Sequence, residues 1–67
     1  MDNAVKVTLK AARVNANLTI YDVASALKVT PQSIRRWENG GGEPKASAFL
    51  KLCELYHIPP ANIFLAE

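Results

Sequence analysis

The 67-residue sequence has a single cysteine and no long apolar run. Cys53 alone can form no internal disulfide, so packing must hold the core and a reducing cytoplasm is the expected setting. No apolar segment approaches the ~20 residues that a membrane helix needs. The acidic start at Met1-Asp2 leads into no apolar stretch of the signal-peptide kind, so no secretory signal is expected. These absences argue against a secreted disulfide scaffold and a membrane protein.

Catalytic and metal-binding constellations are lacking as well. The sequence offers no Ser/His/Asp set and no paired carboxylates, and its glycine run lacks the Lys-Ser/Thr that follows a phosphate loop. Cys53 and His57 supply only two ligands, which do not make a zinc site. We therefore expect no enzyme activity, cofactor, metal or small-molecule ligand, and Cys53 is expected to be a buried inert thiol.

The sequence has only a small excess of positive charge, since the formal net charge is +2. Its distribution is uneven: residues 1–40 hold six of the eight Lys and Arg but only three of the six acidic residues. This gradient fits an ordinary solvated surface or an attraction to nucleic acid, and charge alone does not choose between them.

The apolar residues that are present recur mostly at helical spacing. One clear break, at residues 39–44, has three glycines and a proline. We predict a single all-α domain over residues 1–67, built from five short helices. Their approximate ranges are residues 4–14, 19–27, 30–38, 45–56 and 61–65.

The second and third predicted helices are joined almost directly. Thr19, followed by Asp22, begins one helix with a pattern like a capping box, and Thr30 caps the next. Only Lys28-Val29 separates them, which forces a sharp angle between the two helices. This connection is typical of a helix-turn-helix whose second helix enters the DNA major groove.

The third predicted helix has a narrow apolar stripe and a wide polar face. Ile34 and Trp37 are its only large apolar residues, and Trp37 fits the core better than base stacking. Gln suits adenine and Arg suits guanine in the major groove. The alternative is a plain solvated surface. The predicted base-contacting residues are Gln32, Ser33 and Arg36.

Residues 18–40 resemble the helix-turn-helix of the Cro/C-repressor (XRE) family. The resemblance rests on Leu18-Thr19, Val23-Ala24, Leu27, Val29-Thr30, Ile34 and Trp37-Glu38-Asn39-Gly40. It continues outside this segment at Leu9, Arg13, Pro44, Leu52, Tyr56, Ile58, Ile63 and Phe64. It implies a lambda-repressor-like fold whose helix-turn-helix spans about residues 19–39.

The sequence departs from the family pattern in the turn and the following loop. Lys28 stands where the family often has glycine, so it is expected in a left-handed conformation. Pro31 and Tyr56 are unusual at their positions. The run Gly40-Gly41-Gly42 replaces a basic loop and removes side chains that commonly contact phosphates.

The helix starts and the resemblance together predict the backbone contacts and one ion pair. The predicted DNA backbone contacts are Thr19, Thr30, Arg35, Asn39 and Gly40. The resemblance also implies a partly buried ion pair of Arg13 with Glu38, and Arg13 could in addition contact a phosphate.

The expected function is a sequence-specific, double-stranded-DNA-binding transcriptional regulator of the Cro/repressor type, from a bacterium, phage or mobile element. A domain this small should bind as a homodimer to a palindromic operator. The alternative is a protein-interaction module of the antitoxin or coactivator type, which the polar third helix disfavours. The resemblance places the dimer surface in the closing segment, where the same residues could equally be core. They are Ile58, Pro59, Pro60 and Phe64.

Overall fold

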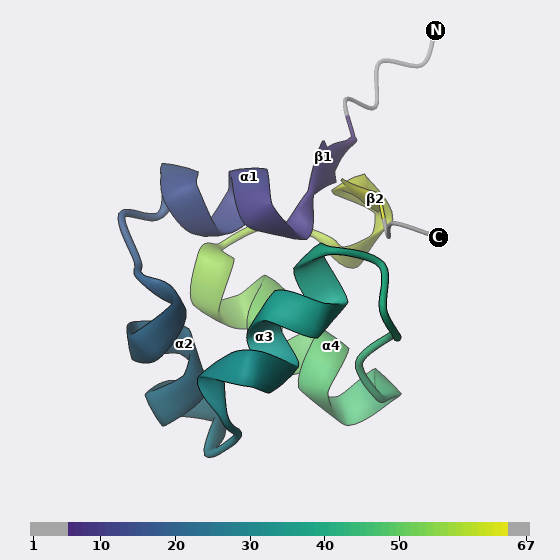
Figure 1. Ribbon diagram of the computed structural model, residues 1–67. Helices are drawn as coiled ribbons and strands as arrows, with labels where there is room; N and C mark the ends of the chain where they lie inside the picture. The colour runs from purple at the N-terminus through teal and green to yellow at the C-terminus, as the bar shows by residue number, and fades with distance from the viewer. Residues whose placement is uncertain (1–5, 65–67) are drawn as a thin grey trace, which may run out of the picture.

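The computed structural model describes residues 6–64, which form a small helical bundle closed by a short sheet (Figure 1). Within these residues four α-helices pack together, rather than the five predicted; a 3-10 turn and one short strand stand where the fifth was predicted, and a second short strand precedes the first helix. The helices are α1 (Leu9–Asn15), α2 (Ile20–Leu27), α3 (Pro31–Glu38) and α4 (Ala46–Tyr56). The remaining elements are β1 (Val7–Thr8), η1 (Pro60–Asn62) and β2 (Ile63–Phe64).

The first helix begins later than predicted, at Leu9. Thr8 caps it, because its Oγ1 accepts a hydrogen bond from the Ala11 N–H at 3.0 Å. Val7 is thereby left extended and pairs with Ile63 instead of continuing the helix. The predicted start at residues 4 and 5 lies outside the described residues. Past α1, Asn17 is left-handed with φ 61°, a conformation that asparagine tolerates better than most residues.

The closing segment was wrongly predicted as one helical turn over residues 61–65. The turn η1 does form, but Ile63 already has extended backbone angles. Ile63 and Phe64 lie parallel to β1, with Val7 opposite Ile63 and Thr8 opposite Phe64. This pairing gives the segment backbone partners while burying the Ile63 side chain.

The core is shared by all four helices and β2. Cys53 is buried there, and burial raises the pKa of its thiol, which fits an inert packing role. Trp37 packs half-buried against the core, as predicted. The buried hydrophobic residues are Leu9, Ala12, Val23, Ala24, Ile34, Leu52, Cys53, Tyr56 and Ile63.

Helix α3 lies across the front of the bundle in Figure 1, with α2 beside it and α4 behind. Ile34 is the one side chain of α3 that is wholly buried. The exposed residues of α3 are Gln32, Arg35 and Arg36, and α2 and α3 together position the polar residues of interest.

Candidate nucleic-acid interface

The turn between α2 and α3 is built on a left-handed lysine. Lys28 ends α2 with φ 60° and ψ 44°, which confirms the conformation expected where the family often has glycine. The next N–H, of Val29, returns to the carbonyl of Ala24 at 3.0 Å. The αL residue and this hydrogen bond reverse the chain within two residues, so α3 starts close to the end of α2.

Because Lys28 carries a Cβ in this conformation, Lys28→Gly is expected to stabilise the domain by about 0.5–1 kcal/mol. Relief of left-handed strain, roughly 1–2 kcal/mol, outweighs the extra chain entropy of glycine, roughly 0.5–1 kcal/mol. Urea unfolding of Lys28→Gly and Lys28→Ala measures the difference. Alanine keeps the strain, so a glycine variant no more stable than the alanine variant would contradict the prediction.

The N-terminus of α2 is closed by a reciprocal cap. The Asp22 N–H donates to Thr19 Oγ1 at 3.0 Å, and the Thr19 N–H donates to Asp22 Oδ2 at 2.9 Å. Hydrogen bonds from the backbone and the side chain of Thr19 hold the pKa of the Asp22 carboxyl below its usual value. A carboxylate therefore lies beside Thr19, the residue predicted to contact a phosphate.

The N-terminus of α3 carries no acidic residue in its first turn. Thr30 Oγ1 accepts from the Ser33 N–H at 3.1 Å, and the two hydroxyl oxygens are 3.0 Å apart. Ser33 is half-buried and tied to this cap, whereas Gln32 beside it is exposed. Gln32 is therefore more accessible to a base than Ser33, its neighbour among the predicted base-contacting residues.

Arg13 of α1 and Glu38 of α3 form the ion pair that the family resemblance implies. Arg13 Nε donates to Glu38 Oε2 at 2.8 Å and Nη2 donates to Oε1 at 3.3 Å. Nη1 donates to the carbonyl of Leu18 at 3.0 Å. The side chains are only 11% and 4% exposed, so the pair is largely shielded from solvent.

The ion pair and the buried Tyr56 influence one another electrostatically. The hydrogen bond with Glu38 raises the pKa of Arg13. Tyr56 is buried nearby, and burial together with the charge of Glu38 raises its pKa to about 12. The Arg13–Glu38 pair is therefore a partly desolvated link between α1, the end of α3 and the loop before α2.

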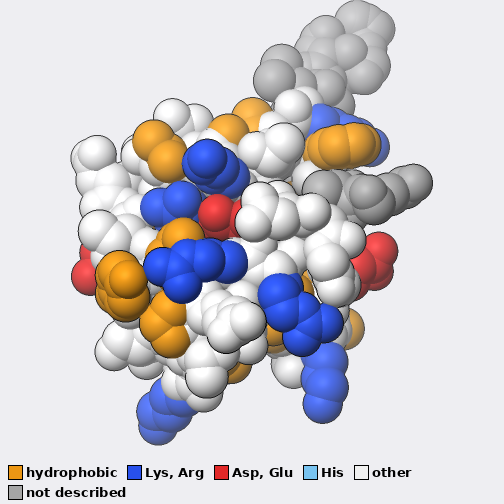
Figure 2. Space-filling view, viewed as in Figure 1, with side chains coloured by type: hydrophobic (Ala, Val, Ile, Leu, Met, Phe, Trp, Pro, Cys, Tyr) orange, Lys and Arg blue, Asp and Glu red, His pale blue; other side chains and the backbone are white. Residues whose placement is uncertain are grey.

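The two adjacent arginines of α3 are held by different partners. Arg35 Nη2 donates to Tyr21 Oη of α2 at 3.2 Å, and its guanidinium lies 5.8 Å from the centre of the Tyr21 ring. Arg36 Nη2 instead donates to the carbonyl of Gly41 at 3.2 Å. Figure 2 shows basic side chains spread over the face that carries α3, with an acidic one among them.

The glycine loop after α3 provides the contact for Arg36. Gly40 is left-handed with φ 80°, and the Gly41 N–H returns to the Arg36 carbonyl at 2.9 Å, as in a Schellman cap. A Cβ on Gly42 would lie 3.3 Å from Arg36 Nη2, a tight approach. The glycine loop has no basic side chains of its own, but it binds the side chain of Arg36 from α3.

The other predicted residues, Asn39 and the four dimer candidates, do not come together in a single site. Asn39 is exposed at the end of α3, and its N–H is directed back to Arg35 and Arg36 carbonyls. In the closing segment, Ile58 packs partly against the core, whereas the other three predicted dimer residues are exposed. Those three are Pro59, Pro60 and Phe64.

Sequence reasoning missed Tyr21 as a member of this surface. Its side chain is 63% exposed, although tyrosine has a large apolar ring. The available signal was its place near the start of α2, between a capping threonine and aspartate and off the buried face of Val23 and Ala24. That signal marks the ring as exposed but does not name Arg35 as its partner.

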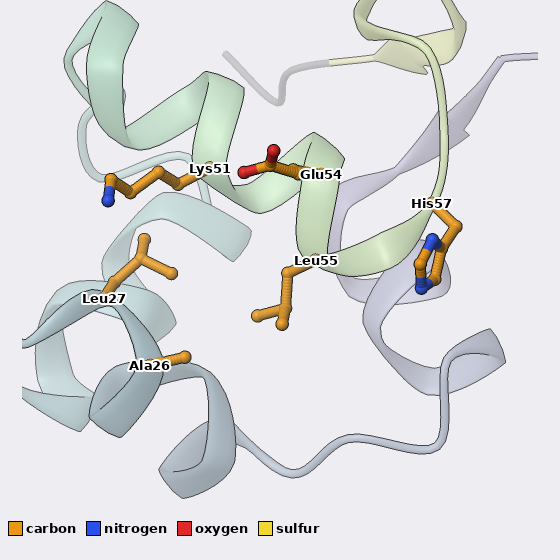
Figure 3. A pocket seen from close by; sticks show the side chains of 6 residues that line it. All are labelled: Ala26, Leu27, Lys51, Glu54, Leu55 and His57. Carbon is orange, nitrogen blue, oxygen red and sulfur yellow. The ribbon is translucent and has the colours of Figure 1, made fainter.

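A cavity of about 330 Å³ opens elsewhere, between the end of α2 and α4 (Figure 3). Its lining mixes apolar and charged side chains and includes none of the predicted DNA-contacting residues. The lining residues are Ala26, Leu27, Lys51, Glu54, Leu55 and His57. Within residues 6–64, no group of three or more His, Cys, Asp or Glu is placed to hold a metal ion.

No helix in the described part of the chain has the length and apolar character to span a membrane.

A family model described as helix-turn-helix matches residues 9–63, which includes every described helix. Searches of curated proteins and of solved structures found no significant match. Because the family model covers most of the sequence, the chain belongs to the Cro/C1-type (XRE) helix-turn-helix family, a family of DNA-binding domains.

Proposed function

We propose that the protein is a sequence-specific transcriptional regulator that inserts α3 into the major groove of double-stranded DNA. The observation that carries the proposal is the surface of α3. Ile34 anchors the helix in the core, while Gln32, Arg35 and Arg36 are exposed. A helix that binds another protein should instead present apolar anchors on that face.

Gln32 and Arg36 are the proposed base readers. They are four residues apart on one helix and so share a face. Gln32 near the N-terminus of α3 can bond adenine N6 and N7, and Arg36 can bond guanine O6 and N7. Arg36 spends one of its five donors on Gly41, which leaves others for a base. Ser33 is a third candidate, whose hydroxyl would exchange its contact with Thr30 for a base.

Phosphate contacts are proposed along both flanks of α3. The helix dipole at the N-terminus of α3 favours an anion, and no carboxylate in that turn opposes one, although Pro31 has no N–H and the Ser33 N–H is already bound to Thr30 Oγ1. At α2 the Asp22 carboxylate weakens the same effect, so Thr19 is the less favourable of the two caps. Arg35 supplies the full positive charge among the proposed backbone contacts. The proposed backbone contacts are Thr19, Thr30, Arg35, Asn39 and Gly40.

We further propose a homodimer on a palindromic operator, acting as a repressor where that operator overlaps a promoter in the cytoplasm. With Arg13 engaged by Glu38 and a loop of glycines after α3, each domain has few cations for phosphates. Two copies reading half-sites about one helical turn apart would supply the missing affinity. Pro59, Pro60 and Phe64 are exposed and could form the contact, whereas Ile58 would contribute mainly by packing.

Selection of bound sites from random duplex DNA tests this function, with the native chain and the variants Gln32→Ala and Arg36→Ala. The native chain should enrich one inverted-repeat site. Each variant should relax one base position per half-site, with about 1–3 kcal/mol of discrimination lost there. Lys51→Ala on α4, outside the proposed DNA contacts, is the matched control and should select the native site.

Two outcomes would contradict different parts of the proposal. A preferred site that neither Gln32→Ala nor Arg36→Ala relaxes would remove the base assignments and leave DNA binding intact. Selection of no duplex by the native chain would remove the DNA-binding function and favour a protein partner.

A further inference from the structure

Tyr21 and Arg35 join the two helices of the helix-turn-helix on their outer surface. The Arg35 guanidinium both donates to the Tyr21 hydroxyl, at 3.2 Å, and lies over its ring, 5.8 Å from the centroid. Both side chains are exposed, and Tyr21 contributes nothing to the buried core. A contact of this kind holds a long side chain in one direction without adding to the packing of the bundle.

The two arginines of α3 are consequently directed to opposite partners. Arg36 leans on the carbonyl of Gly41 in the loop after α3, while Arg35 leans on Tyr21 in the helix before the turn. Residues adjacent on a helix point about 100° apart, so their side chains diverge from the outset. The two contacts fix that divergence, and Arg35 is held toward α2 rather than along the face shared by Gln32 and Arg36.

We propose that Tyr21 is a positioning residue that holds the Arg35 guanidinium toward a DNA phosphate on the α2 side of the groove. The inference rests on the proposed function, because it assigns one contact within that DNA complex. One N–H of Arg35 is spent on Tyr21, and the remaining donors can bond phosphate oxygens. Orienting Arg35 in the unbound domain reduces the side-chain entropy lost when the phosphate is bound.

Affinity for a mixed-sequence duplex, measured over a series of salt concentrations, tests the assignment. Arg35→Ala should lower the slope of log affinity against log salt by about 0.9, as expected for one phosphate contact. Tyr21→Ala should weaken binding about two- to fivefold, the range of an exposed cation–π contact. Tyr21→Phe keeps the ring and should recover part of that loss. The double variant should bind no more weakly than Arg35→Ala alone, because Tyr21 acts only through Arg35.

A measurement on the unbound domain separates the pair from its role. The Arg35 side-chain proton resonances should carry a ring-current shift that is lost in Tyr21→Leu and kept in Tyr21→Phe. Absence of that change would overturn the inference whatever the DNA result. Because Tyr21 is exposed, all variants should remain folded under the binding conditions, which unfolding curves measured in parallel check. Lys51→Ala, a loss of positive charge on α4 outside the proposed contacts, controls for net charge and should leave the salt slope nearly unchanged.

The failures are distinguishable. If Tyr21→Ala bound DNA as tightly as the native domain, the role of Tyr21 would be overturned. The same would follow if the losses of the two single variants added up in the double variant. Either result would leave the proposed function standing. No binding of any duplex by the native domain would overturn both.

Discussion

Glu38→Ala is expected to destabilise the domain by about 3–5 kcal/mol, the largest loss we predict outside the apolar core. The change leaves the guanidinium of Arg13 without its bidentate partner at a site where that side chain is only 11% exposed. A domain of this size is expected to have a total stability of roughly 3–10 kcal/mol. The change should therefore remove a large part of that stability, measured as a shift of the urea unfolding midpoint followed by circular dichroism.

The matched control for Glu38→Ala removes both charges. In Arg13→Met/Glu38→Leu no buried charge is left unpaired, so the double variant should be more stable than either single variant. If Glu38→Ala cost less than about 1 kcal/mol, the pair would behave as an ordinary surface salt bridge and the prediction would be wrong. Loss of DNA binding in Glu38→Ala would follow from unfolding, since Glu38 faces Arg13 rather than the outer surface of α3.

Ile34→Ala is expected to have a comparable effect, with a loss of about 2–5 kcal/mol. Ile34 is 1% exposed and is the single wholly buried side chain of α3, so the change opens a cavity under the helix proposed to read DNA. The same unfolding measurement applies. DNA affinity should fall at least in proportion to the folded fraction, because α3 loses its principal anchor.

Two controls bracket the effect of Ile34→Ala. Ile34→Val removes one methylene and should cost about 0.5–1.5 kcal/mol. Leu50→Ala on α4 removes an exposed side chain and should stay within about 0.5 kcal/mol of the native domain. An Ile34→Ala variant as stable as Leu50→Ala would show that α3 is held by other contacts, of which Trp37 is the leading candidate.

The helix-turn-helix itself could be predicted from sequence because its signals are local. Thr19 and Thr30 each accept a bond from an N–H three residues later, and Lys28 reverses the chain, all within a few residues of one another. These devices depend little on the rest of the fold, so residue order alone carries them.

The contacts that the sequence left unpredicted join distant or irregular segments. Arg13 and Glu38 are 25 residues apart, and only the family resemblance paired them. The strands β1 and β2 are two residues long, too short for an alternating pattern to show. Tyr21–Arg35 and Arg36–Gly41 depend on how one side chain turns, which neither periodicity nor charge specifies.

The pairing of β1 with β2 also determines how the domain would respond to tension. Val7 lies opposite Ile63 and Thr8 opposite Phe64, in parallel. A force that pulls residue 6 away from residue 64 therefore acts along the strands in opposite directions and loads their hydrogen bonds in shear. The hydrogen bonds between β1 and β2 would have to break together before the force reached α1 or α4. The smallest element of the fold would therefore bear the load first.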